Sequence, residues 1–141
     1  MHRYSKNNEY AITAEVFIGK EKVGILSKIF NQNQELYVFV YDKMYCENKF
    51  TRPLVPMMPK TLEPYYSEIL FPIFFSLLSE GNTKKLQCQM HKIDENDDFQ
   101  LLLKTCVHHT IAGIKIKEIT PQSIAREKYK QKQKQLKNEM S

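Results

Sequence analysis

Four prolines between residues 53 and 66 constrain the fold of this 141-residue chain more than any other feature. They are Pro53, Pro56, Pro59 and Pro64. Proline fixes φ and lacks a backbone N–H, so neither a regular helix nor a central strand can run through this segment. We expect an extended edge segment over residues 54–58, followed by an exposed loop that ends at Tyr65-Tyr66. The chain has the length of one domain, and the prolines separate two parts of it with different patterns.

Before the prolines, the sequence is typical of antiparallel strands. Residues 12–18 (ITAEVFI) are rich in β-branched and aromatic side chains, which suits a strand. A polar turn at residues 19–22 joins this run to residues 23–26, and two apolar runs joined by a short turn that contains glycine predict a hairpin. A second turn at residues 31–34 leads to a third strand over residues 36–41. The sequence therefore predicts a three-stranded antiparallel meander.

After the prolines, helical patterns prevail. A helix is predicted to begin at Ser67, because residues 69–78 place apolar side chains at i, i+3 and i+4 spacing. Gly81 is able to end this helix in a left-handed cap. Two further helices are predicted over residues 83–92 and 94–107. The second of them begins in an acidic stretch, whose negative charges suit a helix N-terminus.

Residues 111–119 return to a strand pattern, in which isoleucines alternate with lysines as in a half-buried edge strand. The predicted fold class is therefore α+β. We expect a small, mostly antiparallel β-sheet or partial barrel of about five strands, packed with two or three short helices and followed by a basic C-terminal helix. The predicted organisation is a flexible leader (1–11), one domain (12–119) and a basic helical tail (120–141).

The formal net charge of +5 is unevenly distributed along the chain. Residues 1–114 contain 13 basic and 13 acidic side chains, whereas residues 115–141 contain eight basic and three acidic ones. Lysines spaced by glutamines are able to neutralise phosphates without reading bases. Two interpretations of the tail stay open, a solvated helix and a nucleic-acid-binding segment. The lysines of the second interpretation are Lys128, Lys130, Lys132, Lys134 and Lys137.

Several features predict a cytoplasmic protein with no membrane partner. No apolar run is long enough to span a bilayer, and the longest, residues 69–78, contains Pro72. The N-terminus lacks the apolar stretch of a signal peptide. Three cysteines at Cys46, Cys88 and Cys106 are odd in number and widely spaced, which favours reduced thiols over a disulfide framework.

No residue pattern predicts catalysis, a cofactor or a metal site. Gly19 and Gly24 have the spacing of half a phosphate loop, but Ile25 follows where such a loop needs lysine. Cys106 and His109 share one helix face, yet two ligands do not make a metal site. We therefore predict no catalytic residue, no cofactor and no metal ion.

Two tyrosines in a proline-stiffened loop are the best candidates for binding a partner. Tyr65 and Tyr66 follow Pro64, and aromatic rings on a stiffened loop lose little conformational entropy on binding. We expect one ring to pack inward and the other to be exposed. The predicted partner-binding residues are Pro64, Tyr65, Tyr66, Met57 and Met58.

Five segments together resemble the N-terminal subdomain of HipA-type kinase toxins. They occur in the order of that family, and the resemblance covers residues 14–119. The segments are 16–26, similar to VxxxGxxVGxL; 39–42, similar to a strand ending in YD; 52–59, similar to RPLSLSLP; 70–81, similar to LFPFFDNLLPEG; and 99–114, similar to an FxLL helix followed by D(S/T)(V/I)GAV. Pro56 interrupts the third segment, and His109 replaces the acidic residue of the fifth.

The resemblance implies the fold of that subdomain and a function as a binding protein. In the family, the subdomain precedes a kinase core that binds ATP and carries the catalytic aspartate. A free-standing copy is similar to HipS, the small component of HipBST toxin–antitoxin systems, which neutralises the kinase HipT beside a helix-turn-helix DNA-binding protein, HipB. The resemblance thus implies an antitoxin that docks on a HipT- or HipA-like serine/threonine kinase toxin and inhibits it in trans.

Two alternatives to the antitoxin hypothesis stay open. In the first alternative, the chain is an accessory subunit that a split HipA-like kinase needs for activity. In the second, it is a nucleic-acid-binding protein that uses its basic tail. In a ternary complex with a kinase and a HipB-like protein, DNA is contacted at most indirectly or through this tail.

Overall fold

The structure, a computed structural model, describes residues 9–108, 110, 112–120 and 132–138. Its first three strands, β1 (Glu9–Ile18), β2 (Glu21–Asn31) and β3 (Gln34–Tyr41), form the predicted antiparallel meander. Gly19 turns the chain between β1 and β2 with φ of 62°, a left-handed conformation that glycine adopts at low cost. β1 begins at Glu9, so residues 9–11 belong to the sheet and not to the predicted leader.

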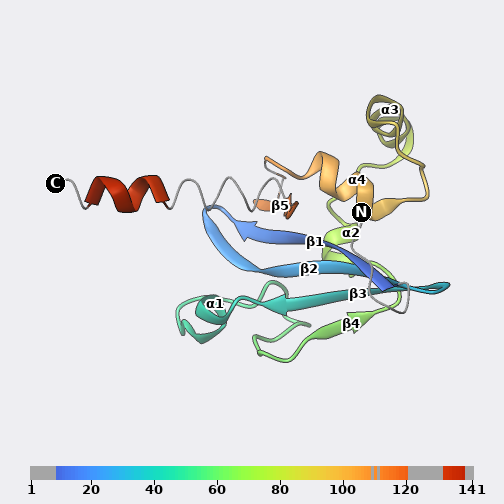
Figure 1. The fold of residues 1–141 in the computed structure, drawn as a ribbon. Coiled ribbons are helices and arrows are strands. Elements are labelled where there is room, and N and C mark those ends of the chain that lie inside the picture. Colours follow the sequence, from blue (N-terminus) through green and yellow to red (C-terminus); the bar gives the residue numbers. More distant parts are fainter. Residues whose placement is uncertain (1–8, 109, 111, 121–131, 139–141) are drawn as a thin grey trace.

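Two short strands complete an open five-stranded sheet with the order β4-β3-β2-β1-β5 (Figure 1). β4 (Tyr65–Ser67) pairs antiparallel with β3, and β5 (Ile114–Glu118) pairs antiparallel with β1. The predicted α+β class is confirmed. The final strand is also confirmed, although it is shorter than the expected range of residues 111–119.

The predicted edge strand over residues 54–58 is wrong. These residues form bends and a turn, because the prolines around them remove the N–H donors that a strand ladder needs. On this side the edge strand is instead Tyr65–Ser67, where the sequence predicts the end of an exposed loop and the start of a helix. Its three residues pair with Tyr37–Phe39 of β3.

The helix predicted to begin at Ser67 starts five residues later, as α2 (Pro72–Phe75). Phe71 has φ of −55° and ψ of 138°, the extended conformation that a following proline favours. Pro72 is tolerated at the first helical position, where its missing N–H has no intrahelical partner to lose. Gly81 has the expected left-handed conformation, with φ of 61°, but it does not cap α2, because α2 ends at Phe75 and Gly81 is the first residue of the next helix.

Three further helices flank the sheet. α1 (Lys43–Glu47) was not predicted; it follows Asp42, whose carboxylate accepts a hydrogen bond from the Tyr45 N–H at 3.2 Å. α3 (Gly81–His91) and α4 (Asp98–Thr105) correspond to the two predicted helices. The acidic stretch caps α4 as expected, because Asp97 accepts from the Gln100 N–H at 3.1 Å.

Residues 132–138 are helical and exposed, which agrees with the prediction of a solvated basic helix for that part of the tail. Lys128 and Lys130 lie outside the described residues. No helix in the described ranges is long and apolar enough to cross a membrane. All three cysteines are free thiols.

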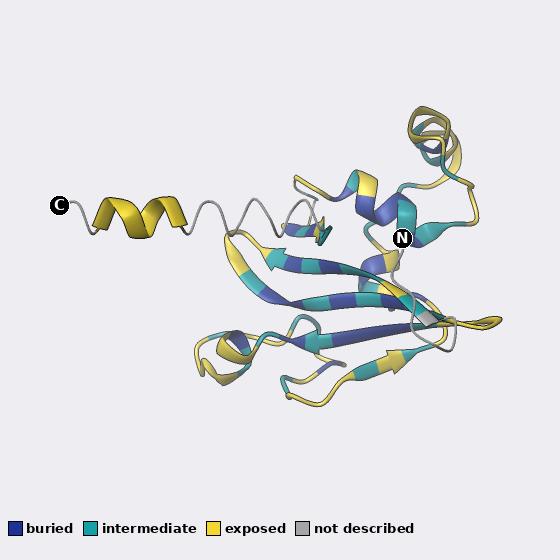
Figure 2. Ribbon diagram, in the orientation of Figure 1, coloured by how far each residue is buried: buried dark blue, intermediate teal, exposed yellow. Residues whose placement is uncertain are grey.

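One side of the sheet, which we call the inner face, carries the hydrophobic core. Figure 2 shows how buried and less buried residues follow one another along the strands. Leu26 of β2 pairs with Ala14 of β1 and Phe39 of β3, and all three side chains are fully buried. Helices α2 and α4 cover this face with Phe74 and Phe99. The ring of Phe74 lies 5.9 Å from that of Phe39, and the ring of Phe99 lies 5.9 Å from that of Tyr37.

Candidate partner-binding face

The opposite side of the sheet is apolar as well. Directly paired residues of neighbouring strands share a face, so the β2–β3 register places Ile25 beside Val40 and Ile29 beside Leu36. In the described ranges, none of these side chains belongs to the core cluster or packs against it. We call this surface the outer face. Its apolar residues are Phe17, Ile25, Ile29, Leu36, Val38, Val40 and Tyr66.

The outer face is unusual for an antiparallel sheet that is covered on one side only. Such sheets normally alternate apolar and polar residues, so that the uncovered side is polar. β3 instead carries six successive apolar side chains over residues 36–41 (LYVFVY). A strand that is apolar on both sides is typical of a sheet with both faces covered. In the described part of the chain, helices pack on the inner face alone. On the outer face, Val38 is buried, Tyr66 is 63% exposed and the other apolar side chains are half-buried. An apolar surface without a packed layer over it marks an interaction site.

Among the side chains that the structure describes, charged residues of the outer face gather at one margin. Glu15 of β1 and Lys22 of β2 form an ion pair at 3.2 Å, and β5 adds Lys115 and Lys117 on the same side. The apolar part therefore extends over β2, β3 and β4, and Ser27 of β2 interrupts it, because Ser27 lies opposite Val38 and hydrogen-bonds to Thr13 at 3.2 Å. An apolar centre with a charged rim is the usual composition of a protein–protein interface.

The two predicted tyrosines lie on opposite faces, as expected, because side chains alternate along a strand. Tyr65 points to the inner side, where its ring contacts Tyr41 edge-on at 6.5 Å and its hydroxyl donates to the Pro59 carbonyl at 2.6 Å. Tyr66 is 63% exposed and lies opposite Val38 on the outer face. Of the pair, Tyr66 is thus the side chain available to a partner.

The two predicted methionines also differ in exposure. Met57 is 89% exposed, whereas Met58 is 7% exposed and belongs to the core. The Tyr41 hydroxyl holds this segment in place, because it donates to the Met58 carbonyl and accepts from the Leu54 N–H at 2.8 Å. The side chain of Met58 is therefore part of the core and not available to a partner. Met57 and the exposed Pro64 are accessible to a partner.

Lysine and tyrosine side chains fix the loop between α1 and β4. The Lys60 ammonium donates to the carbonyls of Asn48 and Thr51 at 2.8 and 2.9 Å. The Tyr45 hydroxyl donates to the Arg52 carbonyl at 2.7 Å. These bonds hold the loop backbone, so binding at Met57 would order its exposed side chain without having to order the loop.

Burial affects the ionisation of the inner tyrosines. It raises the pKa of Tyr37, Tyr41 and Tyr45, because the charged phenolate is poorly solvated beside the core. The hydrogen bond from the Leu54 N–H offsets part of this effect on the pKa of Tyr41. These hydroxyls therefore stay protonated at neutral pH and serve as structural hydrogen-bonding groups.

Among the described residues, no group of three or more His, Cys, Asp and Glu side chains is arranged to hold a metal ion. Cys106 is buried, and burial raises the pKa of its thiol. A thiol held in this neutral form is a poor nucleophile. His109, the second residue of the cluster considered from the sequence, lies outside the described ranges.

The outer face is absent from the residues predicted to bind a partner, except for Tyr66, although the sequence of β3 indicates it. An apolar run over residues 36–41 has no polar side, which is the pattern of a strand buried on both faces. The run predicts a strand, and it also predicts that both sides of this strand are covered. Tyr66 is the one outer-face residue that the sequence identified as a binding candidate.

The fold is that of a small α+β domain built on an open antiparallel sheet. Residues 14–111 match the family model of the HipA N-terminal domain, and the chain belongs to this family. A solved structure of the N-terminal domain of HipA toxin superposes with a TM-score of 0.55 and 27% sequence identity, over 78% of this chain and 94% of that one. An uncharacterized protein of Haemophilus influenzae is 32% identical over 91 residues, which are 64% of this chain and 78% of that protein. These matches confirm the resemblance and the fold that it implied.

Proposed function

We propose that this chain is an antitoxin-type binding protein that docks on a HipT- or HipA-like serine/threonine kinase toxin and inhibits it in trans. The observation that carries the proposal is the outer face, an apolar sheet surface that does not pack against the core in the described structure. Membership of the HipA N-terminal domain family supports it, because the similar solved domain is part of a toxin. A kinase that lacks this domain is the expected partner, with a HipB-like helix-turn-helix protein as the third component.

In this proposal, the outer face supplies the buried centre of the interface, and Tyr66 is its main anchor. Pairing of β4 with β3 fixes the Tyr66 backbone opposite Val38, so that the exposed ring needs little ordering on binding. Large aromatic side chains next to an apolar centre dominate binding free energies at protein interfaces. Inhibition follows because the docked domain blocks the active site of the kinase.

Replacement of Tyr66 by alanine tests the docking surface. We expect Tyr66→Ala to weaken binding to a purified HipA-family kinase that lacks this domain by about thirtyfold, or ~2 kcal/mol, the scale of a hot-spot truncation. Isothermal titration calorimetry measures the change. Met90→Gln on α3 is the matched control, because Met90 is 70% exposed outside the sheet. Unchanged affinity of Tyr66→Ala would remove Tyr66 from the interface.

Co-expression separates inhibition from activation. Cells that express the kinase alone are expected to stop growing, and this chain is expected to restore growth. Growth arrest only when both proteins are present would instead establish the accessory-subunit alternative. The Tyr66→Ala chain, expressed at the same level, is expected to restore growth less well than the unaltered chain.

A second candidate function rests on the exposed helix of residues 132–138. It carries Lys132, Lys134 and Lys137, of which Lys134 and Lys137 share one helix face at i, i+3 spacing. Lysine ammonium groups neutralise phosphates without reading bases. We propose that any DNA binding by this chain uses the tail and weakens steeply with salt. A gel-shift assay with and without residues 120–141 tests this, and binding that survives the deletion would exclude the tail.

A further inference from the structure

A groove lies at the edge of the sheet where β4 ends before β3 does. β4 pairs only with Tyr37–Phe39, so residues 34–36 of β3 have no β4 partner in the described ranges. Two adjoining hollows of about 410 and 470 Å³ flank this free stretch and share Glu35 and Glu68 in their walls. We call the two hollows together the edge groove.

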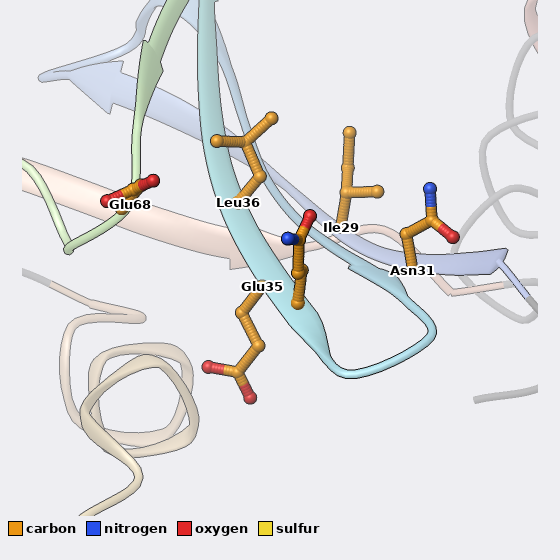
Figure 3. A pocket seen from close by; sticks show the side chains of 6 residues that line it. Ile29, Asn31, Glu35, Leu36 and Glu68 are labelled. Atoms are coloured by element: carbon orange, nitrogen blue, oxygen red, sulfur yellow. The ribbon is translucent and has the colours of Figure 1, made fainter.

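The walls of the edge groove differ on the two sides of β3. Figure 3 shows the side chains of Leu36 and Glu35 pointing to opposite sides of the strand. Leu36 and its neighbour Ile29 belong to the outer face and make that wall apolar. Glu35 lies on the inner side, where Asp98 and the half-exposed Phe75 form the far wall.

The groove keeps unneutralised negative charge. Glu35 contacts the Lys28 ammonium with one carboxylate oxygen at 3.4 Å, and Asp98 contacts the Lys84 ammonium with one oxygen at 3.1 Å. The single charge of each of these two carboxylates is therefore balanced by a lysine, and the net negative charge of the groove comes from Glu68. Glu68 is exposed and forms no ion pair within the described ranges. A cationic side chain in the groove is therefore electrostatically favoured.

We propose that the edge groove binds an extended segment of a partner protein in which lysine or arginine alternates with apolar residues. Such a segment pairs with the free backbone of residues 34–36 and continues the line of β4, which is the β-strand addition mode of peptide recognition. Its period of two places apolar side chains beside Leu36 and cationic ones beside Glu35 and Glu68. This site goes beyond kinase docking by the outer face, because it uses the sheet edge and the helix side.

The chain's own basic tail is a poorer occupant than a partner segment. Its lysines alternate with glutamines over residues 130–135, so it offers no apolar side chain to the Leu36 wall. Residues 132–138 are also helical, which is incompatible with pairing along a strand edge.

An NMR titration of the full chain tests the proposal. The probe is a blocked hexapeptide of alternating valine and lysine, and the matched control is the same peptide with glutamate in place of lysine. We expect saturable amide shifts at residues 34–36 and at Glu68 and Ile69 with the lysine peptide, and none with the glutamate peptide. Glu68→Gln is expected to weaken binding about threefold, since it removes a charge from an exposed side chain without a described ion-pair partner.

Three results would overturn the proposal. One is the absence of shifts at these amides up to about 1 mM peptide, the weakest affinity that a groove of this kind is expected to give. Another is an equal response to both peptides, which would exclude the charge argument. The third is a stronger response of the same amides to a peptide of residues 126–138, which would assign the groove to the chain's own tail.

Discussion

The two faces of the sheet have similar apolar side chains and opposite surroundings. Leu26 and Ile25 are neighbours on β2, yet Leu26 is fully buried under the helices, whereas Ile25 is half-buried on the outer face. The difference arises from the helices and not from the strand, because α2 and α4 pack on the inner side alone. In a strand that is apolar on both sides, the sequence of the strand does not decide which side becomes the core. The outer face, which the helices do not cover, is the one that we expect a partner to bind.

The largest expected effect concerns the inner face. Leu26→Ala is expected to lower the free energy of unfolding by ~2–5 kcal/mol, because it leaves a cavity between Ala14 and Phe39 at a fully closed site. Urea unfolding followed by circular dichroism measures this. A loss below about 1 kcal/mol would mean that the inner face is not the tightly packed one.

Gly24→Ala tests how closely the inner face is packed. A Cβ at this position would clash with the Val40 carbonyl oxygen and lie 2.7 Å from the Phe39 ring. Since the backbone oxygen cannot rotate away, we expect a loss of ~1–3 kcal/mol by the same urea assay. Thermal unfolding of the variant at the unaltered midpoint would show that the strands separate more easily there than the structure indicates.

High pH is expected to weaken the fold through the inner tyrosines. Burial raises the pKa of Tyr37, Tyr41 and Tyr45 above 10.0, so above that pH the unfolded chain releases protons that the folded chain retains. Stability is therefore fully present below about pH 10 and declines as the pH rises beyond it. Urea titrations at about pH 8 and about pH 11 measure the decline. Tyr41→Phe is expected to make the decline of the unfolding free energy with pH less steep. A decline as steep as that of the unaltered chain would exclude Tyr41 as a contributor.

The smallest expected effect on stability concerns the outer face. Ile25→Thr combined with Val40→Thr keeps β-branched side chains at a directly opposed pair and removes apolar groups that do not pack against the core. We expect a loss of less than about 1 kcal/mol in the urea assay. A loss as large as that of Leu26→Ala would show that the outer face is covered within the folded chain.

The sequence predicted the regular parts of the fold and missed what tertiary packing decides. Strands β1 to β3 and helix α4 followed from local patterns, because β-branched runs, turn residues and an acidic N-terminus act within a few residues. The prediction of the edge strand was wrong because a three-residue strand such as Tyr65–Ser67 is stabilised by its partner strand and not by its own sequence. The predicted start of helix α2 was wrong because the apolar spacing after Ser67 predicts a helix from that residue. Pro72 instead favours an extended conformation at the residue before it, so the helix begins at Pro72.

The candidate site was predicted in part for the same reason. Strand alternation separates Tyr65 from Tyr66 only once the register with β3 is known, and the sequence supplied the pair without the register. Met57 and Met58 are adjacent in a loop without regular periodicity, so which of them is buried depends on the hydrogen bonds of Tyr41. Predicting the outer face requires the position of every helix relative to the sheet, and no local sequence pattern contains this information.

The most direct test of the docking role is the affinity of the Ile25→Thr and Val40→Thr double variant for a purified HipA-family kinase that lacks this domain. Isothermal titration calorimetry, with Met90→Gln as the control, compares an outer-face change with an equally mild change on α3. We predict at least about a tenfold loss of affinity for the double variant and none for the control. Equal affinity of the double variant and the unaltered chain would contradict the assignment of the outer face as the docking surface.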